Sequence, residues 1–132
     1  IGIDAYFPLS DEKTPTVEQL RKGWQPHKEK IKSLSMAKNK PIIFTEYGYR
    51  SNNYAAKKPW LVDHSQDDVN LEAQTNATKA IFEEFWSEDW FAGGFVWKWF
   101  IDHKKAGGIN DNRFTPQNKP AQEVIKSFYK IY

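Results

Sequence analysis

Three short apolar runs alternate with stretches of helical periodicity, and this alternation constrains the fold more than any other feature. The apolar runs cover residues 1–7, 41–46 and 91–100, and helical patterns follow them over 14–38, 73–85 and 120–132. Short runs rich in β-branched and aromatic residues are typical of buried strands. Strands separated by helices indicate parallel pairing with right-handed crossovers. The sequence therefore predicts an α/β fold with a parallel sheet.

Loop lengths refine this prediction. Long irregular segments follow the second and third runs, over 50–68 and 101–118, whereas the returns from helix to strand are short. A (β/α)₈ barrel shows the same asymmetry, because its working loops all lie at the carboxyl ends of the strands. A whole barrel needs roughly 200–400 residues, and this chain has 132. We expect three of the eight units, and a chain that starts without Met inside a strand is expected to be a fragment or a processed piece.

Composition excludes several classes of function. The 19 basic and 17 acidic residues are scattered, whereas a nucleic-acid-binding protein should concentrate its basic residues on one surface. No apolar run reaches the length of a membrane span. The chain has no cysteine, and its three histidines lack metal-ligand spacing, so we expect no metal site. Aromatic residues make up 16% of the chain, with six Trp, which predicts either large core side chains or a carbohydrate-facing cleft.

The first helical pattern carries start and stop signals. Thr14 is the expected N-cap with Pro15 at the first helical position, and Asn39 is the expected C-terminal cap. Pro26 predicts a break or kink near Gln25. The predicted buried face holds Leu20, Trp24, Ile31 and Leu34. In the last helix, opened by Pro120, it holds Ala121, Val124, Ile125, Phe128 and Tyr132.

The run 41–46 ends on a carboxylate, Glu46. Strand alternation places Glu46 on the same face as Ile42 and Phe44, with Ile43 and Thr45 on the other. One interpretation is a structural Glu that is hydrogen-bonded to neighbouring strand ends. The other is a catalytic carboxylate at the carboxyl end of a parallel strand, where α/β barrels hold their catalytic residues.

Motifs at the three strand ends show a family resemblance. They are Ile3–Tyr6, Phe44–Ser51 and Gly93–Trp99, and the segments Phe114–Pro116 and Lys119–Ala121 follow them. In this order and spacing they resemble retaining glycoside hydrolases of the (β/α)₈ clan with catalytic Glu residues on strands four and seven. Within that clan the chain is most similar to glycoside hydrolase family 113, whose known activity is β-mannanase. The resemblance implies that residues 1–132 are the C-terminal portion of one catalytic barrel, with strands six to eight.

The resemblance also implies catalytic roles. Glu46 becomes the nucleophile that forms a glycosyl-enzyme intermediate, and Tyr6 becomes a tyrosine that hydrogen-bonds it, so we expect their oxygens within hydrogen-bond distance. Retention requires a second carboxyl about 5–5.5 Å away. In the family that residue ends strand four, which lies outside this chain. The chain alone is therefore expected to be inactive.

Substrate-binding candidates follow from the same resemblance. Trp97 is placed like the strand-eight Trp that floors the −1 sugar subsite, with Trp99 as second choice because alternation gives both the same side. The further candidates are Tyr47, Tyr49 and Arg50 after the nucleophile, Trp60 as an outer platform, and Asp4 as an interior polar residue. Core or loop packing remains the alternative for each aromatic residue, and a barrel-core salt bridge remains the alternative for Asp4.

Two other functions remain open at this point: a non-catalytic carbohydrate-binding module, and a half-barrel that associates with itself. The expected partners are a carbohydrate, with β-mannan first, and the remainder of the barrel or another copy of the chain. We expect no cofactor, nucleic acid or membrane. A polysaccharide substrate favours an extracellular or periplasmic location.

Overall fold

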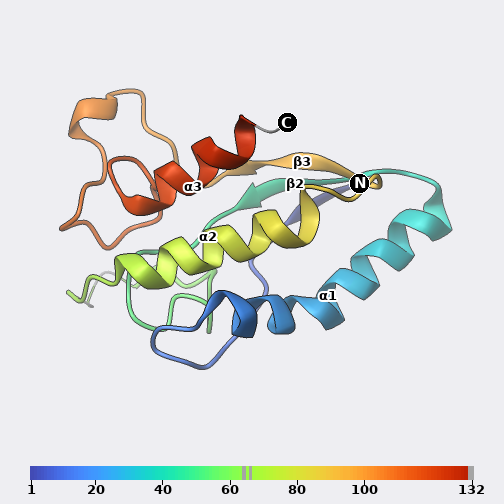
Figure 1. Cartoon of the computed structure of the whole chain (residues 1–132), viewed down its shortest axis with the longest axis horizontal. Coiled ribbons are helices and arrows are strands. Elements are labelled where there is room, and N and C mark those ends of the chain that lie inside the picture. Colours follow the sequence, from blue (N-terminus) through green and yellow to red (C-terminus); the bar gives the residue numbers. More distant parts are fainter. Residues whose placement is uncertain (64, 66, 131–132) are drawn as a thin grey trace.

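The computed structural model describes residues 1–63, 65 and 67–130. Its three strands pair in parallel in the order β1-β2-β3, as the alternation predicts. The strands are β1 (Gly2–Asp4), β2 (Ile42–Tyr47) and β3 (Phe91–Val96). The helices are α1 (Val17–Lys38), α2 (Leu71–Phe85), α3 (Pro120–Tyr129) and the short 3₁₀ helix η1 (His103–Lys105) (Figure 1).

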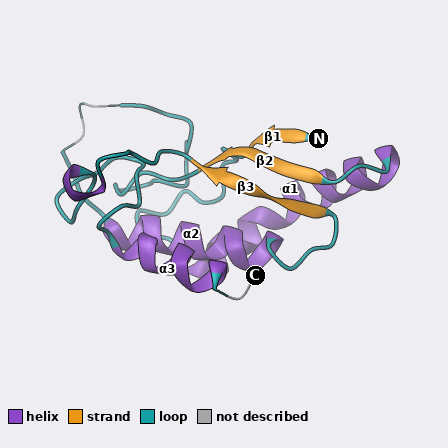
Figure 2. Ribbon diagram, turned by 90° about the horizontal axis from the view of Figure 1, so that it is seen from above, coloured by secondary structure: helices purple, strands orange, loops and turns teal. Residues whose placement is uncertain are grey.

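All three α-helices lie on one face of the sheet, as Figure 2 shows. The long loops extend from the carboxyl ends of the strands, and the N-terminus lies at the opposite end of the sheet (Figure 2). The first and third strands are shorter than predicted: β1 covers Gly2–Asp4 rather than 1–7, and β3 ends at Val96 rather than Phe100. The parallel arrangement nevertheless brings the three strand ends to one rim, where a site can form.

The cap of α1 differs from the prediction. Thr16 is the N-cap, and its hydroxyl accepts from the Gln19 backbone N–H while the Gln19 side chain accepts from the Thr16 N–H. This reciprocal pair is a capping box. Thr14 has another role, because its hydroxyl accepts from the side-chain amide of Asn70 at 2.7 Å. At the other end Asn39 adopts the left-handed conformation with φ 48°, which confirms the predicted cap.

α1 also continues through Pro26, so of the predicted break or kink the break was wrong. Trp24 and Ile31 are buried on either side of the proline, so core packing holds the helix where proline removes a backbone hydrogen bond. The prediction for Leu34 was wrong, because it is 39% exposed. Ser35 is buried instead, and its hydroxyl donates to the carbonyl of Lys40 at 2.7 Å.

The core lies between β2 and the helices α1 and α2. Trp24 of α1 is stacked on Phe44 and meets Phe85 of α2 edge to face, with ring centroids 6.2 and 4.9 Å apart. These aromatic residues thus serve as large core side chains, which is one of the two roles that the high aromatic content predicted. The buried positions predicted for α2 are confirmed: Ala73, Ala77, Ala80, Ile81 and Phe85.

Strict alternation fails at the end of β2. Ile42 and Phe44 are buried as predicted, but the next fully buried residue is Tyr47 rather than Glu46. The cause is a shift in the β2–β3 register between Phe44 and Tyr47. An irregularity of this kind re-aims side chains at a strand end, and here it releases the Glu46 carboxylate from the core.

α3 begins at Pro120, as predicted. Ala121 and Ile125 are buried, while Val124 and Phe128 are half-buried. The remaining residue predicted for this face, Tyr132, lies outside the described residues. α3 therefore packs against α2 through a narrower stripe than the sequence predicts.

Candidate active site

Glu46 and Tyr6 meet where β1 and β2 end. Asp4 pairs with Glu46 in the sheet register, and the Ala5 N–H donates to the Glu46 carbonyl at 2.7 Å. One residue further on, the Tyr6 hydroxyl donates to Oε2 of Glu46 at 2.9 Å. The predicted approach of the two side chains is confirmed, and backbone pairing of adjacent strands sets it.

Tyr6 keeps its proton in this position. Burial raises the pKa of its phenol, and the hydrogen bond to Glu46 and the charge of that carboxylate raise it further. A protonated phenol can only donate to a carboxylate, so the pair has a fixed direction. This arrangement orients one carboxylate oxygen and leaves Oε1 without a hydrogen bond from any residue that the structure describes.

Asp4 lies beside this pair on the exposed face. Its Oδ1 accepts a hydrogen bond from the Thr45 hydroxyl at 2.7 Å, and the side chain is solvent-exposed. Within the described part of the chain Asp4 forms no ion pair, so the barrel-core salt bridge would need a partner from another barrel unit. Asp4 and Glu46 thus present two carboxylates along one edge of the site.

Trp97 lines a pocket of about 250 Å³ together with Arg50, Arg113 and Phe114. The Trp97 backbone N–H donates to the Tyr47 carbonyl at 2.7 Å, which continues the β2–β3 pairing past the strand ends. The Phe114 ring meets the Tyr6 ring edge to face, with centroids 6.3 Å apart. Phe114 therefore connects the Trp97 pocket to the Tyr6–Glu46 pair.

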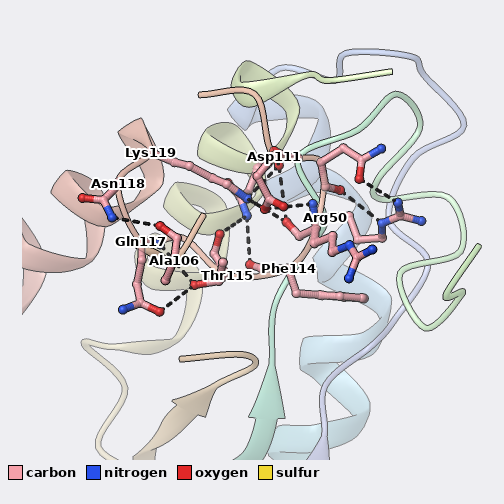
Figure 3. A network of polar contacts seen from close by, with 12 residues as sticks. Arg50, Ala106, Asp111, Phe114, Thr115, Gln117, Asn118 and Lys119 are labelled. Atoms are coloured by element: carbon pink, nitrogen blue, oxygen red, sulfur yellow. Dashed lines mark hydrogen bonds and ion pairs between the residues drawn. The ribbon is translucent and has the colours of Figure 1, made fainter. Parts of the chain in front are cut away.

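Arg50 is held in a polar network that joins three segments (Figure 3). Its guanidinium donates to the Asn112 carbonyl, to the Asn112 side-chain oxygen and to the Asp63 carbonyl. Next to it, Lys119 Nζ donates to Ser51 Oγ at 2.9 Å, to Asp111 Oδ2 at 2.7 Å and to a backbone carbonyl. These contacts fasten the loop after β3 and the start of α3 to the end of β2.

A family model, Glycoside Hydrolase Family 113, matches residues 1–119. The chain belongs to glycoside hydrolase family 113. A comparison with curated proteins finds no match. The resemblance read from the strand-end motifs is thereby confirmed, and the chain is part of a glycoside hydrolase.

Solved structures agree with this family 113 assignment. The chain is similar to a GH113 β-1,4-mannanase, with 23% identity and a TM-score of 0.74, over 100% of this chain and 39% of that one. It is similar to the GH113 β-mannanase of Alicyclobacillus acidocaldarius, with 25% identity, a TM-score of 0.71 and the same coverage. A β-glucuronidase of Faecalibacterium prausnitzii matches at 14% identity and a TM-score of 0.53, over 90% of this chain and 20% of that one.

The chain thus spans about two fifths of the length of the family 113 structures that it matches. Its three β/α units correspond to part of a TIM barrel, which confirms the predicted fold class.

Trp99 lies apart from Trp97 in this family 113 chain. It does not line the Trp97 pocket but two others, and its ring is stacked on His103 with centroids 6.2 Å apart. The prediction that both face the same side was wrong, because β3 ends at Val96 and strand alternation stops there. Trp97, 38% exposed, remains the candidate that adjoins the pair.

Tyr47 and Tyr49 are both in the core. Tyr47 is 1% exposed and contacts Phe82 and Trp86 on the helix side of the sheet. Tyr49 is 1% exposed, and its carbonyl accepts from the buried side chain of Gln74. Neither side chain can reach a sugar in this structure, so packing is the reading that fits. Burial raises the pKa of both phenols.

Trp60 is 52% exposed and lies in the loop between β2 and α2. It lines neither the Trp97 pocket nor the pocket of about 270 Å³ formed by its neighbours Lys58, Pro59 and Leu61. Its ring is therefore available to solvent, as an outer platform would require, but nothing places it beside Glu46.

Sequence reasoning missed the residues that build the rim around Arg50. Asp111 and Arg113 had no assigned role, and Phe114 and Lys119 were noted only as parts of terminal motifs. A lysine before a helix proline reads as a solvent-exposed residue, yet the Lys119 side chain is 0% exposed. The polar partners come from loops, whose course has no periodic signal.

The described residues contain no group of three or more His, Asp or Glu placed to hold a metal ion. None of their helices is both long and apolar enough to cross a membrane.

Proposed function

We propose that this chain is the C-terminal portion of the catalytic barrel of a retaining β-glycoside hydrolase, with Glu46 as its nucleophile. The observation that carries the proposal is the 2.9 Å hydrogen bond from Tyr6 to Glu46 at the carboxyl ends of adjacent parallel strands. Catalytic residues of (β/α)₈ barrels lie at this rim. Family 113 membership supplies the reaction class, hydrolysis of glycosidic bonds.

The geometry supports a division of labour between the two oxygens of Glu46. Tyr6 holds Oε2, while Oε1 receives no hydrogen bond from a described residue. Oε1 then attacks the anomeric carbon, and the C–O bond to the leaving group breaks as the glycosyl-enzyme ester forms. The departing oxygen takes a proton from a second carboxyl, which later activates the water that hydrolyses the ester. That second carboxyl belongs to barrel units outside this chain.

Trp97 provides the floor of the sugar site in this proposal. Its half-exposed ring lies in the pocket that Phe114 connects to Tyr6. An aromatic face offers a sugar ring a large apolar contact, and the backbone of Trp97 is held by the bond from its N–H to the Tyr47 carbonyl. Asp4, exposed beside Glu46, contacts a sugar hydroxyl in this proposal.

The proposed substrate is a β-linked mannan. Two of the similar structures are described as β-1,4-mannanase and β-mannanase, and the fold of this chain follows theirs. The choice of sugar also depends on loops of the other barrel units. The proposal therefore extends to β-linked hexose polymers in general.

The test uses the complete barrel protein that contains this chain. We expect hydrolysis of β-1,4-mannan with retained anomeric configuration. NMR of the first product measures that configuration. Glu46→Gln should lower kcat by roughly 10³-fold or more, while the matched control Glu123→Gln, on the exposed side of α3, should leave it unchanged. Inverted product or full activity of Glu46→Gln would refute the assignment of the nucleophile. Binding of β-glycans without turnover of any would instead support a carbohydrate-binding module.

A further inference from the structure

Two pockets at the rim share Arg50 as a common wall. One is the Trp97 pocket of about 250 Å³, and the other, of about 270 Å³, lies under the loop after β2. Their linings contain five cationic side chains, namely Arg50, Lys57, Lys58, Lys98 and Arg113. Only one acidic residue, Asp63, lines them. The chain as a whole has 19 basic and 17 acidic residues, so this rim departs strongly from the average.

Little in the described structure compensates these positive charges. All three contacts of the Arg50 guanidinium go to neutral amide oxygens. Lys98 Nζ lies over the rings of Trp97 and Phe100, 5.4 and 5.5 Å from their centroids. Arg113 and Lys58 form no ion pair with a described residue, and both are exposed.

Lys57 completes the set. Its Nζ lies 3.6 Å from a carboxylate of Asp11 whose side chain is 85% exposed. A pair this long and this open to water contributes little. The cations of the rim thus remain available to a ligand.

Lys119 provides a contrast within the same network (Figure 3). This buried cation is neutralised by Asp111 at 2.7 Å and its three protons are all donated. Burial lowers the pKa of Lys119, Asp111 opposes that effect, and the nearby charge of Arg50 lowers the pKa further. The positive charge of Arg50 therefore acts on Lys119 inside the network.

We propose that the natural substrate of this site is an acidic β-glycan, whose anionic group binds between Lys98 and Arg113 beside Trp97. Arg113 and Lys98 line the same pocket as Trp97, and Lys98 Nζ lies over the Trp97 ring, so a carboxylate, sulfate or phosphate on a sugar in this pocket can meet two cations. Charge-assisted hydrogen bonds from a guanidinium to such oxygens are short and strong. Lys57 and Lys58 extend the positive surface to the next sugars. The inference rests on the proposed function and narrows its substrate class.

The test compares ligands that differ only in charge. The complete protein carrying Glu46→Gln, which should bind without turnover, is titrated calorimetrically with three hexasaccharides: β-1,4-mannan, β-1,4-mannuronate and an O-sulfated β-1,4-mannan. The mannuronate chain has the mannan linkage but a carboxylate at C6, whereas the sulfated chain carries its charge on a substituent. We expect at least one anionic ligand to bind about tenfold or more tightly than neutral mannan at low salt, and which one does so identifies the anionic group. The preference should shrink as salt shortens the Debye length.

Variants locate the effect. Arg113→Gln and Lys98→Gln should each weaken binding of the preferred anionic ligand by about threefold to tenfold, and should weaken binding of neutral mannan clearly less. Lys79→Gln, the same charge change on the outer side of α2, is the control and should alter neither affinity. Lys58→Gln should have a smaller effect that grows with the length of the oligosaccharide.

Two results would overturn the inference. The first is that neutral mannan binds as tightly as the anionic ligands, or more tightly, at low salt. The second is that Arg113→Gln and Lys98→Gln change the preference for anionic ligands no more than Lys79→Gln does. Carboxylates from the other barrel units that neutralise these cations would produce the first result. Failure of the proposed function looks different, because the protein with Glu46 intact would then hydrolyse neither neutral nor acidic glycans, whatever it binds.

Discussion

Tyr6 and Glu46 illustrate how backbone pairing prepares a polar contact. The Ala5 N–H bonds the Glu46 carbonyl at 2.7 Å, so the two strand ends cannot separate without breaking the sheet. The side-chain bond at 2.9 Å therefore forms between groups that are already held. Little conformational entropy remains to be lost when a substrate arrives, and preorganised contacts of this kind stabilise transition states most effectively.

Tyr6→Phe in the complete enzyme should lower kcat/KM by about tenfold to a hundredfold. The reason is that a hydrogen bond to a charged group contributes about 1.5–3 kcal/mol. Because the pKa of Tyr6 is raised above its ordinary 10.0, the phenol stays protonated at working pH. The loss should then be the same from about pH 5 to about pH 9. Kinetics across that range check this, and a loss confined to alkaline pH would contradict it.

Tyr49 has a buried hydroxyl without a hydrogen-bond partner among the described residues, and burial raises its pKa above 10.0. A phenol whose pKa is raised by burial keeps its proton in the folded state, whereas the unfolded chain loses that proton above about pH 10, so folding becomes less favourable as pH rises past that value. Tyr49→Phe should therefore be at least as stable as the parent at pH 7 and increasingly more stable at alkaline pH. Thermal melts from pH 7 to pH 11 test this, with exposed Tyr54→Phe as the control that should follow the parent.

At the scale of elements, the Lys119 network joins α3 to the end of β2. Lys119→Met should lower the free energy of unfolding by about 2–4 kcal/mol, because removing one partner of a buried ion pair leaves the other uncompensated. The 25% exposure of Asp111 moderates the cost. Lys105→Met is the matched control: its side chain is 85% exposed and its pair with Asp102 spans 3.3 Å, so a change within about 0.5 kcal/mol is expected. Urea unfolding of the complete protein measures both, and equal effects would show that the network is not holding the rim.

Elements with a periodic pattern were predicted well, and contacts made by loops were not. The helix Leu71–Phe85 and the Asn39 cap follow from apolar spacing and local cap chemistry. The register shift after Phe44 depends on how β3 packs against β2, which no local pattern reports. This shift determines the geometry of the site, because it leaves Tyr47 in the core and Glu46 at the rim, whereas strict alternation predicted Glu46 on the core face. The capping box at Thr16 was missed because Thr14 offered an equally good local signal.

At the scale of the whole molecule, the sheet has two unpaired outer edges, along β1 and β3. Its helix-free face is also uncovered (Figure 2), and Phe95 of β3 is 66% exposed. Backbone groups at open strand edges favour pairing with another chain. We propose that the remaining barrel units cover these surfaces, and that the isolated chain associates with its own copies or is poorly soluble without them.

The last prediction is that the isolated 132-residue chain hydrolyses no β-glycan, whereas the same chain joined to the rest of its barrel does. Glu46 can act as the nucleophile, but general acid assistance from a second residue contributes typically about 10²–10⁴-fold, and we propose that this second residue belongs to other barrel units. Both proteins would be assayed on β-mannan, on an acidic β-glycan and on an activated aryl β-mannoside, whose good leaving group needs the least protonation. Turnover by the isolated chain that Glu46→Gln abolishes would show that the acid/base lies within these residues, and Asp4, beside Glu46 on the same rim, would be the first residue to replace. Turnover by neither protein would remove the hydrolase interpretation, since the joined barrel contains every unit that the mechanism requires.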